Sequence, residues 1–341
     1  MSRPISHLLL FLTVGLLLLW PGGGRAERLA ITFATDWKAQ AEHGGFYQAL
    51  AKGLYAARGL DVTIRPGGPQ QDNPRLIAAG ALDLAMASNG FQPLTLSAAG
   101  AEVTVVMAAF QKDPQVLMTH PGDAVASLKD LAGRPVFIGD SAVATFWPWL
   151  KARFGYTDDQ IRKYAYSLAP WLTNPGTVQE GYLTSEPFTT EQAGVVPNVY
   201  LFADAGYQGY AAMVMVTNRF LATHEDAVAA FVAASIEGWA DYMTGDPAPA
   251  NALIKAHNAE MTDALLAFSR RRMGEVGLVT SGDVARLGIG AMTEQRWRAF
   301  YDEMSALGVL PRGLDVTDVF TTRFLTGVGA AAASAEGAAG R

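Results

Sequence analysis

Short apolar segments alternate with longer amphipathic ones along the first third of the chain. The apolar segments predict strands at residues 29–34, 60–64, 82–87 and 103–109. The segments between them predict helices at residues 45–58, 73–79 and 91–98. This order of strand and helix is typical of a largely parallel sheet with helices on both faces. Ligands bind beyond the carboxyl ends of the strands in such sheets, so we expect a binding site there.

A second series of strands and helices begins near Pro121. The pattern predicts a helix at 125–131, a strand at 135–138, a helix at 143–154 and a strand at 195–202. A strand at 211–216 then returns to the first unit, and long helices follow at 225–242, 248–257, 262–273 and 293–307. The chain therefore crosses between the units twice, near 113–119 and 210–217. The predicted fold class is α/β, with two lobes of mostly parallel sheet joined by a two-strand hinge. One lobe comprises residues 27–115 plus 211–325, and the other comprises residues 116–210.

Both ends of the chain differ in composition from the rest. Arg3 precedes an apolar run at residues 8–20, and small residues stand three and one positions before Glu27. This layout is typical of a secretory signal peptide cleaved before Glu27. An uncleaved anchor is the alternative, but the run is shorter than the ~20 residues that span a bilayer. We therefore expect a periplasmic protein. Residues 326–341 are rich in Ala, Gly and Ser without periodicity, and we expect them to be disordered.

The composition excludes several kinds of chemistry. The chain has no cysteine, which removes thiol nucleophiles, disulfides, iron–sulfur clusters and Cys-ligated zinc. The formal net charge is −6 and no long basic run occurs, so a nucleic-acid partner is not expected. The glycine-rich fingerprints of dinucleotide and P-loop sites are missing, and no two histidines have metal-ligand spacing on one helix. Ser141 lies in a turn that superficially matches a nucleophile elbow, but Val143 stands where the motif requires glycine. We predict no enzyme, no metal and no cofactor.

Polar and aromatic residues gather where the predicted strands end. Trp37 follows the first strand, where its indole either packs in the core or stacks on a planar ligand. His43 lies near a helix N-terminus, which favours a neutral imidazole able to make one hydrogen bond. Asn89 and Ser141 stand in strand-to-helix turns, where backbone N–H groups and small polar side chains face a ligand.

These residues belong to a longer pattern that resembles a known family. The chain carries Trp37 and His43, then Gly45-Phe46-Tyr47, Lys52-Gly53-Leu54-Tyr55, Gly59-Leu60-Asp61-Val62 and Gly80-Ala81-Leu82-Asp83. Together they resemble the NMT1/THI5-like (SsuA/THI5-like) family of periplasmic solute-binding proteins. The resemblance implies a type II periplasmic binding protein fold. It also implies a monomer that binds a small solute and docks on an ABC permease in the inner membrane.

The motif with Trp37, His43 and Tyr47 is most similar to the branch that binds pyrimidine precursors of thiamine, such as hydroxymethylpyrimidine or its formylamino relative. In that branch an aromatic residue and a carboxylate of the second lobe contact the pyrimidine, which here implies Tyr182 and Glu186. A carboxylate accepts strong hydrogen bonds from an amino group, and it repels an anionic solute. The predicted ligand-binding residues are therefore Trp37, His43, Tyr47, Asn89, Ser141, Tyr182 and Glu186.

Two alternatives remain open. One is a receptor for another solute, either riboflavin, or taurine, an alkanesulfonate or nitrate. The other is a pyrimidine synthase like the eukaryotic members of the family, which draw on a lysine and a histidine. The corresponding strand end, residues 85–91, has neither residue, and this favours a receptor.

Overall fold

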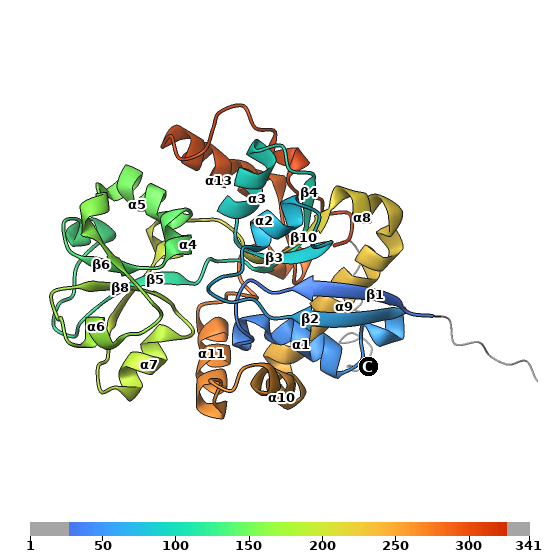
Figure 1. Ribbon diagram of the computed structural model, residues 1–341, viewed down its shortest axis with the longest axis horizontal. Coiled ribbons are helices and arrows are strands. Elements are labelled where there is room, and N and C mark those ends of the chain that lie inside the picture. The colour runs from blue at the N-terminus through green and yellow to red at the C-terminus, as the bar shows by residue number, and fades with distance from the viewer. Residues whose placement is uncertain (1–26, 326–341) are drawn as a thin grey trace, which may run out of the picture.

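The computed structural model describes residues 27–325 and contains two five-stranded sheets with helices packed around them (Figure 1). The predicted signal peptide and the predicted disordered tail lie outside these residues. The first sheet has the strand order β2-β1-β3-β10-β4, and the second has the order β7-β6-β8-β5-β9. The sequence prediction of an α/β fold with two mostly parallel sheets is confirmed.

Each sheet contains four strands that run in one direction and one strand that runs against them. In the first sheet the parallel strands are β1 (Leu29–Ala34), β2 (Leu60–Arg65), β3 (Leu84–Asn89) and β4 (Val103–Phe110). The antiparallel strand between β3 and β4 is β10 (Ala211–Thr217). The edge strand β2 alternates buried and exposed residues, whereas β10 is buried throughout, as expected for edge and central positions.

The second sheet is formed by the middle of the chain. Its parallel strands are β6 (Val136–Ile138), β7 (Ile161–Lys163), β8 (Val178–Tyr182) and β9 (Asn198–Leu201). The strand β5 (Gln115–Thr119) pairs antiparallel with both β8 and β9. The strands that run against their neighbours, β5 and β10, are also the ones that follow the two crossings between the sheets. The connections comprise residues 111–114 and 202–210, which lie slightly before the crossings predicted near 113–119 and 210–217.

Helices cover both faces of the first sheet. On one face α1 (Gly44–Ala51) and α9 (Glu225–Thr244) bury an apolar cluster, and α10 (Ala248–His257) packs outside α1. The other face is covered by α2 (Asn73–Ala78), α3 (Phe91–Ala98) and α13 (Glu294–Ala306). Around the second sheet lie α4 (Asp140–Val143), α5 (Phe146–Phe154), α6 (Ala169–Leu172) and α7 (Glu186–Gln192). No helix in the described part of the chain is long and apolar enough to span a membrane.

Some predicted boundaries are wrong. The helix predicted at 45–58 ends at Ala51, because the chain turns through Gly53 at φ +69° before the short 3-10 turn Ala56–Arg58. The helix predicted at 125–131 is only a 3-10 turn at Leu128–Leu131, held by a reciprocal pair of hydrogen bonds between Ser127 and Asp130. Strands β7 and β8 are absent from the prediction.

The two crossings are held by one side chain. Arg296 on α13 donates to the backbone carbonyl of Gln111, before β5, and to that of Gln208 at 3.2 Å, before β10. Its guanidinium also lies 4.2 Å from the centre of the Tyr210 ring. Arg296 therefore ties both connections between the sheets to the helix that covers the first sheet.

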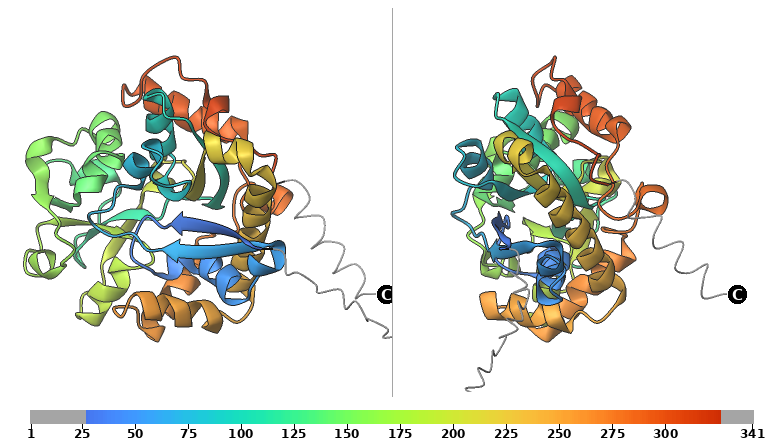
Figure 2. Two further views of the ribbon diagram at one scale, coloured as in Figure 1. Left: turned by 45° about the vertical axis from the view of Figure 1, so that its right-hand side comes forward. Right: turned by 90° about the vertical axis from the view of Figure 1, so that its right-hand side faces the viewer.

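The two halves of the molecule also meet where α7 packs beside α11 (Asp263–Glu275), as Figures 1 and 2 show. Phe188 on α7 packs against Phe268 on α11 with ring centres 5.3 Å apart. Thr184 lies between β8 and α7. Its hydroxyl donates to the side chain of Glu42, which lies just before α1 beside the first sheet. Its backbone carbonyl accepts a hydrogen bond of 2.6 Å from the Ser269 hydroxyl on α11. This arrangement brings the two halves together over the space between the sheets.

Candidate functional site

A cleft of about 550 Å³ lies between the two sheets, beyond the carboxyl ends of β1 and β3 on one side and β8 on the other. This is the edge at which parallel strands place ligands. Six of the seven sequence-predicted residues line the cleft, namely Trp37, His43, Asn89, Ser141, Tyr182 and Glu186. The structure also brings Asp36, Glu42, Gln115, Tyr164, Tyr166 and Glu180 to its walls, none of which the sequence analysis identified.

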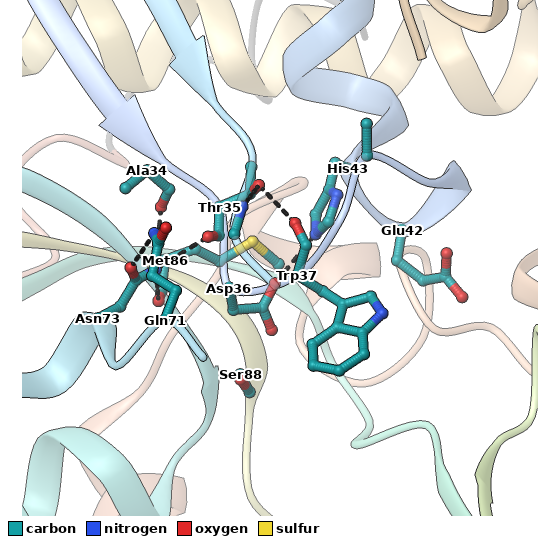
Figure 3. A network of polar contacts seen from close by, with 12 residues as sticks. Ala34, Thr35, Asp36, Trp37, Glu42, His43, Gln71, Asn73, Met86 and Ser88 are labelled. Carbon is teal, nitrogen blue, oxygen red and sulfur yellow. Dashed lines mark hydrogen bonds and ion pairs between the residues drawn. The ribbon is translucent and has the colours of Figure 1, made fainter. Parts of the chain in front are cut away.

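Asn73 organises the first wall (Figure 3). Its side-chain amide nitrogen donates to the carbonyls of Ala34, Thr35 and Met86 at 3.0–3.3 Å. These bonds join the end of β1 and the interior of β3 to the start of α2. They fix the turn from which Asp36 and Trp37 project.

His43 is fully buried behind that turn. Its Nε2 lies 2.9 Å from Oδ1 of Asp36, and its Nδ1 has no hydrogen-bond partner within residues 27–325. The imidazole therefore holds the Asp36 carboxylate in place at the cleft wall. Direct contact of His43 with a solute stays a prediction.

Tyr47 lies outside the cleft, in contrast to the sequence prediction. The helical rotation of α1 turns its ring away from the cleft and toward α10, where the ring is fully buried. Its hydroxyl lies 2.9 Å from Nδ1 of His257. The side chain stabilises the packing of α1 on α10, and we no longer expect it to contact the solute.

An aromatic contact crosses the cleft. The ring centres of Trp37 and Tyr166 lie 4.7 Å apart at an angle of 52°, and Tyr164 adjoins Tyr166 at 5.2 Å. Tyr166 has φ +59°, a conformation that costs energy in a non-glycine residue and that is frequent at functional sites. The aromatic partner of Trp37 in the structure is thus Tyr166, whereas the resemblance implied Tyr182.

The cleft is acidic. Six carboxyl groups lie among its lining residues, those of Asp36, Glu42, Asp72, Asp140, Glu180 and Glu186, and the same set contains no lysine or arginine. Burial raises the pKa of Glu42 and of Glu186 above the usual range. Burial and the nearby Glu186 raise the pKa of Glu180 to about 8, although the backbone N–H of Gly139 opposes this shift. Such a wall favours neutral or cationic solutes over anions.

These raised pKa values predict that acid stabilises the solute-free protein. Between the ordinary value of 4.5 and about 8, the folded chain keeps a proton on Glu180 that the unfolded chain has lost. Asp113, beside the first crossing, adds the same effect between 3.8 and about 7, because burial raises its pKa. The free energy of unfolding is therefore expected to fall as the pH rises from 5.5 to 8.

Urea denaturation at pH 5.5 and at pH 8 measures this fall in the free energy of unfolding. A variant with Glu180 and Asp113 both changed to the amide should show a shallower pH dependence, with the remainder due to Glu42 and Glu186, and an unchanged slope would contradict the assignment.

The two sheets with a cleft between them have the periplasmic binding protein fold. Residues 40–250, more than half of the chain, match the model of the NMT1/THI5-like family, and the chain belongs to this family. It is 26% identical over 305 residues to the riboflavin-binding protein RibY of Chloroflexus aurantiacus, covering 87% of this chain and 86% of that protein. The family prediction made from the sequence is confirmed.

Solved structures share the architecture at low sequence identity. The alkanesulfonate-binding protein SsuA of Xanthomonas axonopodis pv. citri, bound to MOPS, superposes with a TM-score of 0.61 at 16% identity. That match covers 87% of this chain and 99% of SsuA. The desulfurization enzyme DSZB superposes with a TM-score of 0.57 at 14% identity, covering 89% of this chain and all of DSZB. The fold thus serves both binding proteins and an enzyme, and the functional argument depends on the cleft itself.

Proposed function

We propose that this chain is the solute-binding component of an ABC importer and holds a small planar heterocycle between two lobes in the periplasm. The lobes are residues 27–115 plus 211–325 and residues 116–210, and they close by rotation at the two crossings. The closed form docks as a monomer on a permease of the inner membrane, with no cofactor. The observation that carries the proposal is an aromatic-walled, carboxyl-rich cleft between two sheets, with no cationic side chain among its described lining residues.

The favoured solute is a pyrimidine precursor of thiamine, such as hydroxymethylpyrimidine or its formylamino relative. Its flat ring suits the faces of Trp37 and Tyr166, and its amino group suits the carboxyl groups of the second wall. Taurine, alkanesulfonates and nitrate are disfavoured, because their sulfonate or nitrate group would lack a cationic partner among six carboxyl groups. A synthase is disfavoured by the absence of lysine and histidine at residues 85–91, and we propose that the chain is not an enzyme.

Riboflavin is the second candidate. The relative RibY is named for binding it, and the cleft volume of about 550 Å³ lies within the range typical of sites for drug-sized ligands. Its isoalloxazine ring is planar and offers hydrogen-bond donors and acceptors along one edge.

Thermal unfolding tests the proposal with protein stripped of solute by unfolding and refolding. Hydroxymethylpyrimidine, its formylamino analogue, riboflavin, taurine and nitrate are added one at a time. A solute at 100 times its dissociation constant adds about 2.7 kcal/mol to the free energy of unfolding, a shift of several degrees. We expect shifts with the pyrimidines. A shift with riboflavin alone would select the second candidate, and shifts with taurine or nitrate alone would overturn the proposed solute class. No shift with any of them would reject both candidate solutes.

A further inference from the structure

Glu186, the carboxylate expected from the resemblance to contact the solute, is already occupied within the protein. Its Oε2 accepts a hydrogen bond of 2.7 Å from the backbone N–H of Tyr182, and its Oε1 accepts one of 3.3 Å from the hydroxyl of Tyr164. The side chain folds back over Gly181, where an added Cβ would lie only 2.8 Å from the Glu186 Cβ. Glu186 therefore stabilises the turn between β8 and α7.

Glu180 differs from Glu186 because half of its carboxyl group remains unpaired. It precedes Tyr182 by two residues on β8, so both side chains lie on the same face of the sheet, and both line the cleft. Its Oε2 accepts a bond of 2.5 Å from the backbone N–H of Gly139, and within residues 27–325 its Oε1 has no partner. Glu180 thus has one oxygen, Oε1, without a partner and a second, Oε2, that accepts a single bond and keeps one lone pair for a solute.

Aromatic and hydroxyl groups lie beside this carboxyl group. A Cβ placed on Gly139 would lie 3.3 Å from the Tyr166 hydroxyl and 3.6 Å from Oε2 of Glu180, so these two atoms lie close to the same point. The ring of Tyr166 in turn contacts Trp37. A planar solute held against these rings would therefore present its edge to Glu180.

Burial and the carboxyl group of Glu186 on α7 favour the neutral form of Glu180, whereas the backbone N–H of Gly139 favours the charged form. The other side chains that interact with Glu180 are phenols, those of Tyr164 and Tyr166 after β7 and of Tyr182 on β8. Asp140 of α4 also acts on Tyr166, and its cationic partner Lys163 is largely exposed at 3.5 Å. Burial together with Glu186 raises the pKa of Glu180 to about 8, so the carboxyl group is mostly protonated at pH 7. A protonated carboxyl group offers an O–H donor and a C=O acceptor side by side.

We propose that Glu180 recognises the solute by a two-point pair, donating its carboxyl proton from Oε1 and accepting an N–H at Oε2. This inference rests on the proposed function and deepens it. The edge of the solute that complements this carboxyl group has a hydrogen-bond acceptor next to an N–H. An aminopyrimidine presents it as a ring nitrogen beside an amino group, and isoalloxazine presents it as a carbonyl beside an imide N–H. Glu180 is then a specificity-determining residue of the cleft.

Substitution of Glu180 tests the pair, with isothermal titration of hydroxymethylpyrimidine and riboflavin between pH 6.5 and 9.5. Glutamine has the donor and acceptor of a protonated carboxyl group, so we expect Glu180→Gln to bind within about threefold of wild type at pH 7. Glu180→Ala loses both bonds and should bind about thirty-fold more weakly. Wild-type affinity should fall about tenfold per pH unit above the pKa of Glu180, whereas that of Glu180→Gln should stay level. The control is Glu191→Gln on α7, an exposed glutamate outside the cleft, which should behave as wild type.

Two outcomes overturn the inference. If Glu180→Gln binds as weakly as Glu180→Ala, the solute requires a charged carboxylate. If wild-type affinity rises with pH, the solute binds the deprotonated form. Binding of riboflavin alone would reject the pyrimidine and leave the same variants to test Glu180.

A measurement without solute separates this inference from the proposed function. Carbon-13 NMR of the glutamate side chains, with Glu180→Gln to assign the signal, follows the titration of Glu180 directly. If neither probe binds, the proposed solutes are wrong, and a titration near pH 8 still supports a protonated Glu180. A titration near the ordinary value of 4.5 would overturn the inference whichever solute binds.

Discussion

Replacing Gly238 with alanine is expected to lower the free energy of unfolding by about 3 kcal/mol, the upper end for overpacking a core. Gly238 lies in α9 where this helix crosses α1. A Cβ at this position would lie 2.2 Å from the carbonyl oxygen of Gly45 and 2.7 Å from the Cβ of Ala49. Because the nearest atom belongs to the backbone, no change of rotamer relieves the clash. The two helices would have to separate, and the apolar cluster between them would lose contacts.

Gly274→Ala is the matched control, because Gly274 also lies in a helix. Within 4 Å, its added Cβ would meet only Cε of Met243, at 3.9 Å. Alanine there should stabilise the protein by about 0.5–1 kcal/mol, the difference in helix propensity. Urea denaturation of both variants gives the comparison. Equal stability of the two would contradict the close crossing of α1 and α9.

Replacing Trp37 with alanine is expected to weaken solute binding by roughly ten- to a hundredfold, because stacking on an aromatic face contributes ~1–3 kcal/mol. The indole is partly exposed and contacts Tyr166 across the cleft, outside the main apolar clusters. The solute-free variant should therefore unfold within a few degrees of wild type. Titration calorimetry with hydroxymethylpyrimidine and a thermal scan without solute measure the two effects.

Trp37→Phe is the control for this variant, since it keeps an aromatic face and should retain most of the affinity. The opposite pattern would be a large fall in melting temperature of solute-free Trp37→Ala with unchanged affinity. It would place the indole in the core, the alternative that the sequence left open.

The elements that the sequence predicted are those with strong apolar patterns. β1, β3, β4 and β10 are nearly continuous apolar segments, and α9 has twenty residues of helical pattern. Strand β8 reads Val178-Gln179-Glu180-Gly181-Tyr182, with polar residues and a glycine in its interior. It forms because β6 and β5 flank it in the sheet, a long-range pairing that no local pattern reveals.

The same limit explains which cleft residues were missed. Trp37 and Asn89 follow recognised strands, so their position was predictable. The sequence analysis missed Glu180 because it missed strand β8. Had β8 been recognised, the spacing of two residues between Glu180 and Tyr182 would have indicated that both side chains lie on one face of the sheet. Tyr166 contacts Trp37 only because the two sheets face each other, and 129 positions separate these residues in the sequence. Tyr47 was misplaced because the family motif does not specify which side of α1 faces the cleft.

Arg296 limits where the chain can bend in the closure that we propose. Its bonds to the carbonyls of Gln111 and Gln208 hold both connections to α13, which packs on the first sheet and also meets α5 through an ion pair of Glu303 with Arg153 at 2.9 Å. While the Arg296 bonds hold, a bend falls in residues 112–114 of one connection and before Gln208 in the other. Gly206, at φ +107°, is in that second stretch. Closure as proposed would then change torsion angles in these two short stretches, and the ion pair between Arg153 and Glu303 would have to adjust with them.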